Sequence, residues 1–457
     1  MIYFIAAIAG LAGALFGFDE GVIAGALGPL RTDFGIDPLA EGVMTAAVPF
    51  GALAGALIGG RIAPASGRRR MLLGAALLFI CGALGSALAW DLWSLTAARL
   101  VIGVAVGMAA MMAPLYISES APTAQRGMLV SIYQLAVTLG ILGAYVVGYL
   151  LSDSWRWMFA MGALPALVLF FGIFSQTDTP RWLMARGRQT EARRALAHLR
   201  NVPETHPDVE KELSEIRSAS VADLKPGRLS DLFTPQLRPA LYVSMGLFLL
   251  QQLSGINAVI YYAPTVFQIS GFDSTSTQIL ATAGVGAVNV LMTIVGMLLI
   301  DRLGRRLLLL LGFAGTAVAL GAIAISSATG SPSLGVVALG GLLLYISAFA
   351  ISIGPLPWVM MAEVFPLNVR SLGMSLASLV NWGFNFLVVF SFPVLVAELG
   401  LAGVFAIYAL VCIAGLAFTL RAVPETSGVS LEDIERHLKS GRPFRELGTA
   451  PLASRAL

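Results

Sequence analysis

Three charged side chains stand inside long apolar stretches of this chain. Asp19 and Glu20 are consecutive in the first stretch, and Arg99 lies in a later one. A charge buried in hydrocarbon is costly, so such residues usually serve a function. If these two stretches cross a membrane in opposite directions, Asp19 and Arg99 lie at similar depths, roughly 8–13 Å below the outer surface at about 1.5 Å per residue. They can then form an ion pair.

An Asp19–Arg99 pair has two interpretations. It is either a structural salt bridge between two helices or a proton-binding site. Arg99 stays charged and holds Asp19 ionised, but if the pair separates into drier surroundings, desolvation favours the protonated carboxyl group. Proton occupancy that depends on conformation is what a proton-coupled carrier requires. Glu20 points about 100° away from Asp19 on a helix, and the sequence alone assigns it no role.

Uncharged amides form a second group in the apolar stretches. A lone Asn or Gln in a membrane helix usually bonds to a neighbouring helix, but several of them beside aromatic side chains indicate a ligand. Amides donate and accept hydrogen bonds, so they suit an uncharged polyhydroxylated molecule, whereas an anion would call for more buried cations than Arg99. The polar and aromatic residues concerned are Gln134, Gln251, Gln252, Asn257, Tyr261, Tyr262, Asn289, Trp358, Asn381, Trp382 and Asn385. Gly354 and Pro355 interrupt one of these stretches and allow it to bend.

Other reactive residues indicate neither a metal site nor an enzyme. Cys81 and Cys412 lie in apolar segments and are interpreted as small core residues. The three histidines are scattered through polar stretches, so no disulfide or metal framework is expected. A phosphate-cradling Gly-rich loop and a Ser–His pair are also missing from the sequence. The net charge of +3 is modest. We therefore expect no cofactor, no nucleic-acid partner and no enzymatic activity.

The composition places these residues in a membrane. The 457 residues are 57% hydrophobic and only 12% charged, about half the charged share of a soluble domain. A bilayer is crossed by roughly 20 apolar residues. The first stretch lacks the positive start of a signal peptide, so we expect it to remain as a helix. The predicted helices are 2–28, 42–62, 71–90, 94–116, 127–151, 155–174, 240–268, 277–300, 307–328, 333–361, 371–396 and 400–420.

The chain repeats itself. The pattern Glu-x-x-Pro-x-x-x-Arg occurs from Glu119 to Arg126 and from Glu363 to Arg370, and the basic turn at Gly67 has a counterpart at Gly304. Internal duplication is a common design of secondary transporters. We predict an all-α membrane protein of twelve helices, with a six-helix half (1–175), a linker with short helices (176–238), a second six-helix half (239–421) and a tail (422–457). Because positively charged loops stay inside, the linker and both termini are predicted to be cytoplasmic.

Several motifs resemble those of the sugar porter family of the major facilitator superfamily, and the resemblance covers essentially the whole chain. The motifs are Gly17 to Leu27, Thr179 to Leu183, Gln251 to Phe267, Gly354 to Glu363 and Val423 to Thr426. The resemblance implies that Asp19 and Arg99 form a proton-coupling pair. It implies sugar contacts at Phe16, Gln134, Gln251, Gln252, Asn257, Asn289, Trp358, Asn381 and Asn385. It implies a cytoplasmic salt-bridge network of Glu119, Arg126, Asp301, Arg305, Glu363 and Arg370, whose charges are expected to pair when the two halves close on the inside.

The chain departs from the family pattern at four places. Pro64 and Ala65 replace a polar pair, which predicts a weaker contact at the inner gate of the first half. Asp178 stands in an altered form of the motif Pro-Glu-Ser-Pro-Arg. Glu20 replaces a small hydroxyl residue. The short lead before the first helix suggests a start upstream of Met1.

The leading hypothesis is a proton-coupled importer of a neutral monosaccharide that works as a monomer in the cell membrane by alternating access. A sugar uniporter with a structural Asp19–Arg99 pair is the first alternative. A sugar sensor that does not transport is the second, although sensors usually carry longer cytoplasmic extensions than the tail ending at Leu457.

Overall fold

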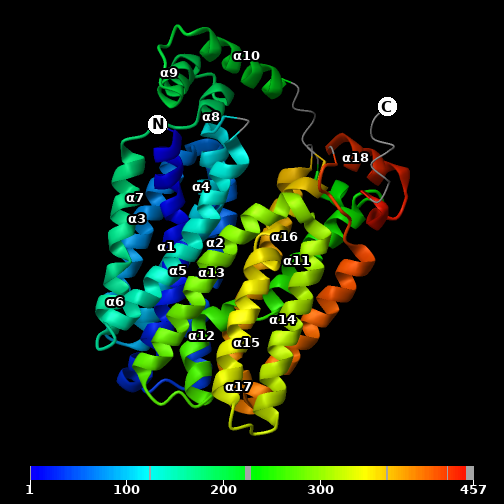
Figure 1. The fold of residues 1–457 in the computed structure, drawn as a ribbon. Coiled ribbons are helices and arrows are strands. Elements are labelled where there is room, and N and C mark those ends of the chain that lie inside the picture. Colours follow the sequence, from blue (N-terminus) through cyan, green and yellow to red (C-terminus); the bar gives the residue numbers. More distant parts are fainter. Residues whose placement is uncertain (1, 123–124, 222–227, 367–368, 430, 449–457) are drawn as a thin grey trace. The chain divides into compact units, whose positions relative to one another are not determined.

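The protein consists of two units built from long apolar helices (Figure 1). The structure is a computed structural model that describes residues 2–122, 125–221, 228–366, 369–429 and 431–448. Within these ranges every regular element is helical. The chain divides into one compact unit of Met1–Leu224 and another of Lys225–Leu457.

The first unit contains six apolar spans. Two of them begin with a capping side chain. Asp37 accepts a hydrogen bond from the amide of Ala40, and Asp91 forms a capping box with Ser94. A break at Gly162 divides the sixth span into two helices. The helices are α1 (Ile2–Phe34), α2 (Pro38–Ser66), α3 (Arg68–Ala87), α4 (Leu92–Ser120), α5 (Arg126–Leu150), α6 (Trp155–Met161) and α7 (Ala163–Phe174).

Small residues bring pairs of these helices unusually close. A Cβ atom added to Gly17 of α1 would lie 1.9 Å from the backbone oxygen of Val137 of α5. At the α2–α4 contact, a Cβ on Gly55 would lie 2.2 Å from the oxygen of Val104. Without a hydrophobic force between helices in lipid, such close packing is what holds them together. It fixes α1, which carries Asp19, against α5.

The second unit also contains apolar spans, and two of them are broken. The helices are α11 (Arg238–Leu253), α12 (Ile256–Ile269), α13 (Thr275–Leu303), α14 (Arg305–Ala328), α15 (Leu334–Ala348), the π-helical segment η3 (Phe349–Ile353), α16 (Leu356–Val364) and α17 (Arg370–Ala422). The predicted interruption at Gly354 and Pro355 is present, between η3 and α16. A π-helical turn is often found at a functional site.

The span count of the described chain agrees with twelve helices. Eleven segments are long and apolar enough to cross a membrane. One of them, α17, has 53 residues and changes direction at Gly400, whose φ of 65° and ψ of 178° are not helical. Counting α17 as two spans gives six in each unit. The predicted fold class is confirmed.

A continuous helix was predicted over 240–268, and this was wrong. The chain breaks at Ser254 and Gly255, between α11 and α12. Gly255 has a φ of 89°, in the left-handed region that favours glycine. A Cβ atom at this position would lie 2.4 Å from the ring of Tyr408. Apolar periodicity continues through the break, which is why it escaped a prediction based on hydropathy.

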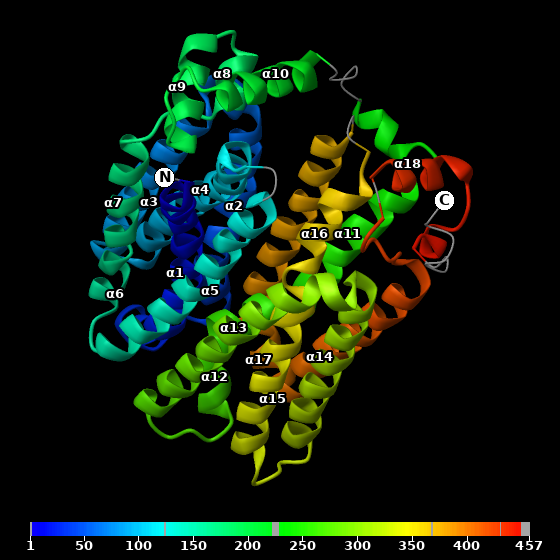
Figure 2. The ribbon, with the colours of Figure 1, turned by 45° about the horizontal axis from the view of Figure 1, so that its top comes forward.

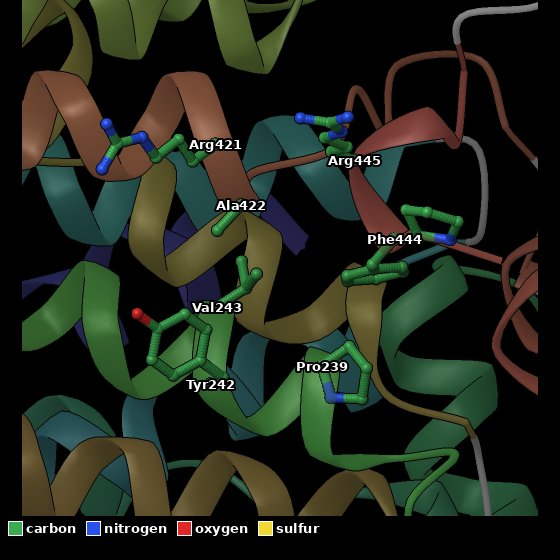
Figure 3. Close-up of a pocket in the computed structure, with 8 residues that line it drawn as sticks. Pro239, Tyr242, Val243, Arg421, Ala422, Phe444 and Arg445 are labelled. Carbon is green, nitrogen blue, oxygen red and sulfur yellow. The ribbon is translucent and has the colours of Figure 1, made fainter. Parts of the chain in front are cut away.

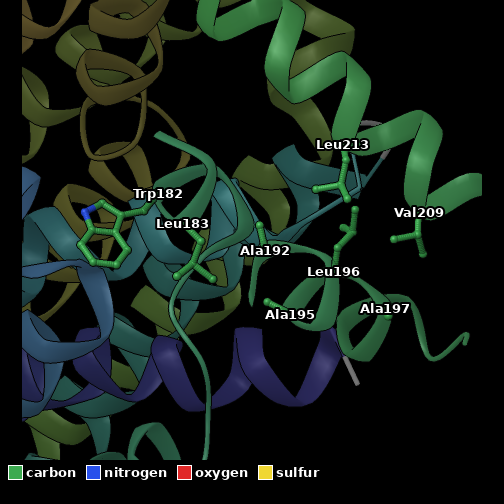
Figure 4. Packing of buried hydrophobic residues seen from close by; sticks show 8 residues of the cluster. All are labelled: Trp182, Leu183, Ala192, Ala195, Leu196, Ala197, Val209 and Leu213. Atoms are coloured by element: carbon green, nitrogen blue, oxygen red, sulfur yellow. The ribbon is translucent and has the colours of Figure 1, made fainter. Parts of the chain in front are cut away.

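The linker contains three short helices, as predicted: α8 (Pro180–Ala185), α9 (Gln189–Arg200) and α10 (Pro207–Val221). They lie at the end of the first unit where α1 begins (Figure 1). Their apolar faces share a small core (Figure 4) of Trp182, Leu183, Ala192, Ala195, Leu196, Ala197, Val209 and Leu213. The linker is therefore a packed element of the first unit.

The C-terminal tail packs onto the second unit near the start of α11 (Figure 2). It forms α18 (Leu431–Ser440) and the short helix η4 (Phe444–Glu446), and the 3₁₀ helix η2 (Leu229–Phe233) precedes α11. The tail closes one side of a surface pocket of about 370 Å³ (Figure 3). The pocket includes Tyr242, nine residues or roughly 13 Å along the helix from Gln251. It is thus separate from the amide side chains described below.

The interpretation of both cysteines as core residues is half wrong. Cys412 is fully buried, but Cys81 of α3 is exposed on the surface of its unit. A helix in a bilayer is apolar on its lipid-facing side as well as its packed side. An apolar segment therefore does not show which of its residues point inward.

Candidate functional site

Asp19 and Arg99 come together in the first unit. The pair joins α1 to α4, with 3.5 Å between Oδ1 of Asp19 and Nη1 of Arg99. The two side chains are 1% and 0% exposed. The structure therefore brings together the two residues that the sequence suggested could meet.

Hydrogen bonds contribute little to this pair. Oδ2 of Asp19 and all three guanidinium nitrogens of Arg99 are buried without a hydrogen-bond partner in the described chain. Arg99 also lies over the ring of Phe159, at 5.6 Å from its centroid. Removing one partner of a buried ion pair leaves an uncompensated charge and destabilises strongly. Charge attraction rather than a bonded network therefore holds α1 and α4 together here.

The other predicted sugar contacts of the first unit are Phe16 on α1 and Gln134 on α5. Both side chains are half-buried. Because α1 and α5 pack closely together, both residues stand on the same helix pair as Asp19.

In the second unit, three predicted amides form one hydrogen-bonded chain. Nδ2 of Asn257 donates to Oε1 of Gln252 at 2.6 Å, and Nε2 of Gln252 donates to Oδ1 of Asn381 at 2.7 Å. The three side chains are 4–6% exposed. They come from α12, α11 and α17, so the network joins helices on both sides of the Gly255 break.

The side chain of Gln251 bonds to backbone instead of to other side chains. Its Nε2 donates to the backbone oxygens of Ile353 and Gly354, at 2.7 and 2.8 Å. These carbonyl groups lie where η3 ends and the regular helix is interrupted. The amide nitrogen of Gln251 therefore binds backbone that the broken helix leaves free.

The three other predicted sugar contacts of the second unit differ in burial and in hydrogen bonding. Asn385 lies one helical turn after Asn381, is 2% exposed, and its Oδ1 has no hydrogen-bond partner within the described residues. Asn289 of α13 is 7% exposed. Trp358 of α16 is 37% exposed, and its ring packs edge-on against Phe248 with centroids 4.8 Å apart. A partly exposed indole can contact the apolar face of a ligand ring.

The sequence did not single out Ser254 and Tyr345 as functional residues. Their hydroxyl oxygens lie 3.2 Å apart, and Tyr345 also donates to the backbone oxygen of Ser254 at 3.2 Å. Tyr345 of α15 therefore supports the backbone at the break between α11 and α12. The Ser-Gly pair inside an apolar run was the available signal.

One charge cluster of the predicted network belongs to the first unit. Arg68 pairs with Glu119 at 2.9 Å, and Thr179 donates to the same carboxylate. Asp178 accepts from the backbone amides of Arg68 and Thr179. Burial raises the pKa of Asp178, although these amides oppose the shift. Asp178 and Thr179 thereby connect the start of α3 to the linker.

A matching cluster belongs to the second unit. Arg305 pairs with Glu363 at 3.0 Å and with Asp301 at 3.1 Å. Thr426 donates to Glu363, and Glu425 accepts from the amide of Arg305. Glu425 and Thr426 thus occupy the places that Asp178 and Thr179 have in the first unit, and the internal repeat extends to a third motif.

These contacts correct part of the predicted network. Glu119 and Glu363 each pair with an arginine of their own unit, so pairing does not require the halves to close. Arg370 forms no ion pair in the described chain; its Nε donates to the oxygen of Phe365. The side chain of Arg126 lies outside the described residues.

The expected weakness at Pro64 is compensated through the backbone. The carbonyl oxygen of Pro64 accepts from the indole of Trp182 at 3.0 Å and from Arg186 at 2.7 Å. The end of α2 therefore keeps a polar contact with α8 and the residue that follows it, although the side chains of Pro64 and Ala65 are apolar.

Comparison with known proteins agrees with the resemblance found in the motifs. The family model described as "Sugar (and other) transporter" matches residues 5–438. A galactose-proton symporter of Escherichia coli (strain K12) is 39% identical over 452 residues, 98% of this chain and 97% of that protein. A D-xylose transporter of Levilactobacillus brevis is 38% identical over 457 residues, 98% of each chain.

Solved structures agree as well. A partially occluded, inward-open structure of the xylose transporter XylE from E. coli has a TM-score of 0.82 at 31% identity and covers 94% of this chain and 99% of its own. The proton:xylose symporter XylE bound to 6-bromo-6-deoxy-D-glucose has a TM-score of 0.79 at 32% identity, over 96% of this chain and 99% of that chain.

Proposed function

The chain belongs to the sugar (and other) transporter family, and we propose that it imports a neutral monosaccharide together with protons by alternating access. The observation that carries the proposal is the buried Asp19–Arg99 pair, 3.5 Å apart and almost fully shielded from solvent. Similarity over nearly the whole chain to a galactose-proton symporter and to a D-xylose transporter supports a hexose or pentose as the substrate.

The amide network is the proposed sugar-binding surface of the second unit. Gln252, Asn257 and Asn381 orient one another, Asn385 adds an unpaired amide oxygen, and Asn289 adds a further buried amide. A site built to bond hydroxyl groups discriminates strongly against ligands that lack them, because its buried polar groups are then left unpaired. Trp358 adds an apolar surface for the ring of the sugar. Phe16 and Gln134 are the contacts proposed for the first unit.

Asp19 is the proposed proton site. While it faces Arg99, attraction keeps it ionised; when α1 and α4 move apart, burial favours the protonated form. The breaks at Gly255 and Gly354 allow parts of the second unit to bend during this change. The two cytoplasmic charge clusters hold each half together at its inner end.

A sugar uniporter is the alternative, and the low hydrogen-bond content of the Asp19–Arg99 pair argues against it. A purely structural ion pair is most useful when all its hydrogen bonds are made. We propose that both termini and the linker lie in the cytoplasm, because the linker and the arginine clusters follow the positive-inside rule. The proposed location is the cell membrane, and the proposed functional unit is a monomer.

Uptake of labelled sugars tests the proposal. Cells that express the protein should accumulate one or more hexoses or pentoses, and a protonophore should reduce uptake to equilibration. A charged sugar phosphate should not compete. Accumulation that survives the protonophore would contradict proton coupling, and uptake of none of the sugars would contradict the substrate class.

A further inference from the structure

Glu20 is a second buried carboxylate in α1, and the mechanism above gives it no role. It directly follows Asp19, and its side chain is 4% exposed. Arg99, the buried cation of this region, is paired with Asp19. The described chain offers Glu20 no ion pair, and its sequence neighbour Asp19 carries a like charge. A carboxylate at this place in a span needs a partner or a proton.

The helices that pack against α1 are α4, α5, α6 and α7. Of their basic residues, Arg99 of α4 is committed to Asp19. Arg156 of α6 donates to the backbone oxygens of Ala87 and Ala89. The sequence of α7 contains no titratable residue, and the side chain of Arg126, at the start of α5, is not described.

The remaining titratable neighbours are an acid and phenols. Glu119 of α4 is bound to Arg68 at the cytoplasmic end. On α5, Tyr133 and Tyr145 lie near Glu20. The hydroxyl of Tyr133 is buried without a hydrogen-bond partner in the described part of the chain. Phenols can bond to a carboxyl group but cannot neutralise it.

Charge balance then fixes the state of the cluster. With Asp19, Glu20 and Arg99 all ionised, the buried cluster carries one net negative charge. With a proton on Glu20, the cluster is neutral while the Asp19–Arg99 pair stays intact. Burying an uncompensated charge is far less favourable than burying a neutral carboxyl group. Glu20 therefore holds a proton in this conformation.

We propose that Glu20 is a second proton-binding site of the transport cycle, so that two protons enter with each sugar. This inference rests on the proposed function. A carboxyl group in water ionises near pH 4, so Glu20 releases its proton to any water that reaches it. Alternating access lets a proton from the outer water bind the carboxylate and leave from it to the cytoplasmic water.

The ratio of internal to external sugar concentration at zero net flux measures the number of protons coupled to each sugar. Purified full-length protein in liposomes is given a pH difference of one unit, with the membrane potential clamped at zero. Each coupled proton contributes about a tenfold sugar gradient per pH unit. Wild type should therefore balance at about 100-fold. Glu20→Gln, and Glu20→Thr as a second variant, should balance at about tenfold while still exchanging labelled sugar at equal concentrations.

Glu20→Asp keeps a carboxyl group and should stay at the wild-type ratio. Glu41→Gln is the matched control: Glu41 is 3% exposed but paired with Arg31 at 2.6 Å, so its neutralisation should leave the ratio unchanged. A wild-type ratio of about tenfold would overturn the second site and leave the proposed function standing. A ratio of one would overturn the proposed function itself. Glu20 variants that keep the full wild-type ratio would remove Glu20 from the proton path.

Discussion

Two adjacent glutamines, Gln251 and Gln252, look alike in the sequence but have different hydrogen-bond partners in the structure. Gln252 stands in the middle of a side-chain network, between Asn257 and Asn381. Gln251 instead holds the backbone of Ile353 and Gly354. At the residue scale, we therefore propose that Gln252 takes part in sugar binding, whereas Gln251 supports the backbone of the broken helix.

Gln252→Ala should weaken sugar binding. The change leaves buried amide groups of Asn257 and Asn381 unpaired, at about 1–3 kcal/mol, or roughly 5- to 150-fold in affinity. Asn257→Ala should act in the same direction. Sugar binding to purified protein, measured by calorimetry, is the test. Unchanged affinity in both variants would return the network to the role of a helix-to-helix contact.

Gln251→Ala is the matched comparison. It should lower the apparent melting temperature, because two buried backbone carbonyls lose their donor. If Gln251→Ala reduced sugar affinity as much as Gln252→Ala without a loss of thermal stability, the division of tasks proposed here would be wrong.

At the scale of elements, breaks in the helices place the polar groups. The break at Gly255 allows Asn257 to bond back to Gln252, five residues earlier, where a continuous helix would bring residues three or four apart together. The break after η3 exposes the carbonyls that Gln251 binds. Two interrupted helices therefore orient Gln251, Gln252 and Asn257, and α17 completes the network with Asn381.

Gly255→Ala should damage this arrangement. A left-handed φ costs a non-glycine residue about 1–2 kcal/mol, and the new Cβ atom would also meet the ring of Tyr408 at 2.4 Å. Gly271→Ala is the control, because Gly271 has a φ of 98° but open space around it. The Gly255 variant should lose more thermal stability than the Gly271 variant. Equal losses would show that the contact with Tyr408 does not matter.

For the whole molecule, the sequence predicted the fold better than the details of the site. Hydropathy and the repeat were sufficient for twelve helices, because spanning a bilayer leaves few alternatives to long apolar helices. The Asp19–Arg99 contact followed from their depths in two antiparallel spans. Helix ends were less certain: α1 extends to Phe34, whereas 28 was expected.

Other features depend on tertiary contacts. The break at Gly255 is stabilised by Tyr345 and Tyr408, far away in the chain. The pairing of Glu119 and Glu363 with arginines of their own halves depends on helix packing, which charge patterns do not encode. The outward position of Cys81 could not be predicted, because lipid-facing and core-facing residues are equally apolar. Such information lies in the packing of distant segments.

Proton entry driven by sugar is the most direct test of whether the protein couples proton transport to sugar transport. Liposomes with purified protein and an internal pH-sensitive dye are held at equal pH on both sides, and sugar is then added outside. We expect internal acidification that follows sugar entry, disappears with a protonophore and is smaller per sugar in Asp19→Asn. Sugar entry without any change of internal pH would contradict proton coupling and identify a uniporter.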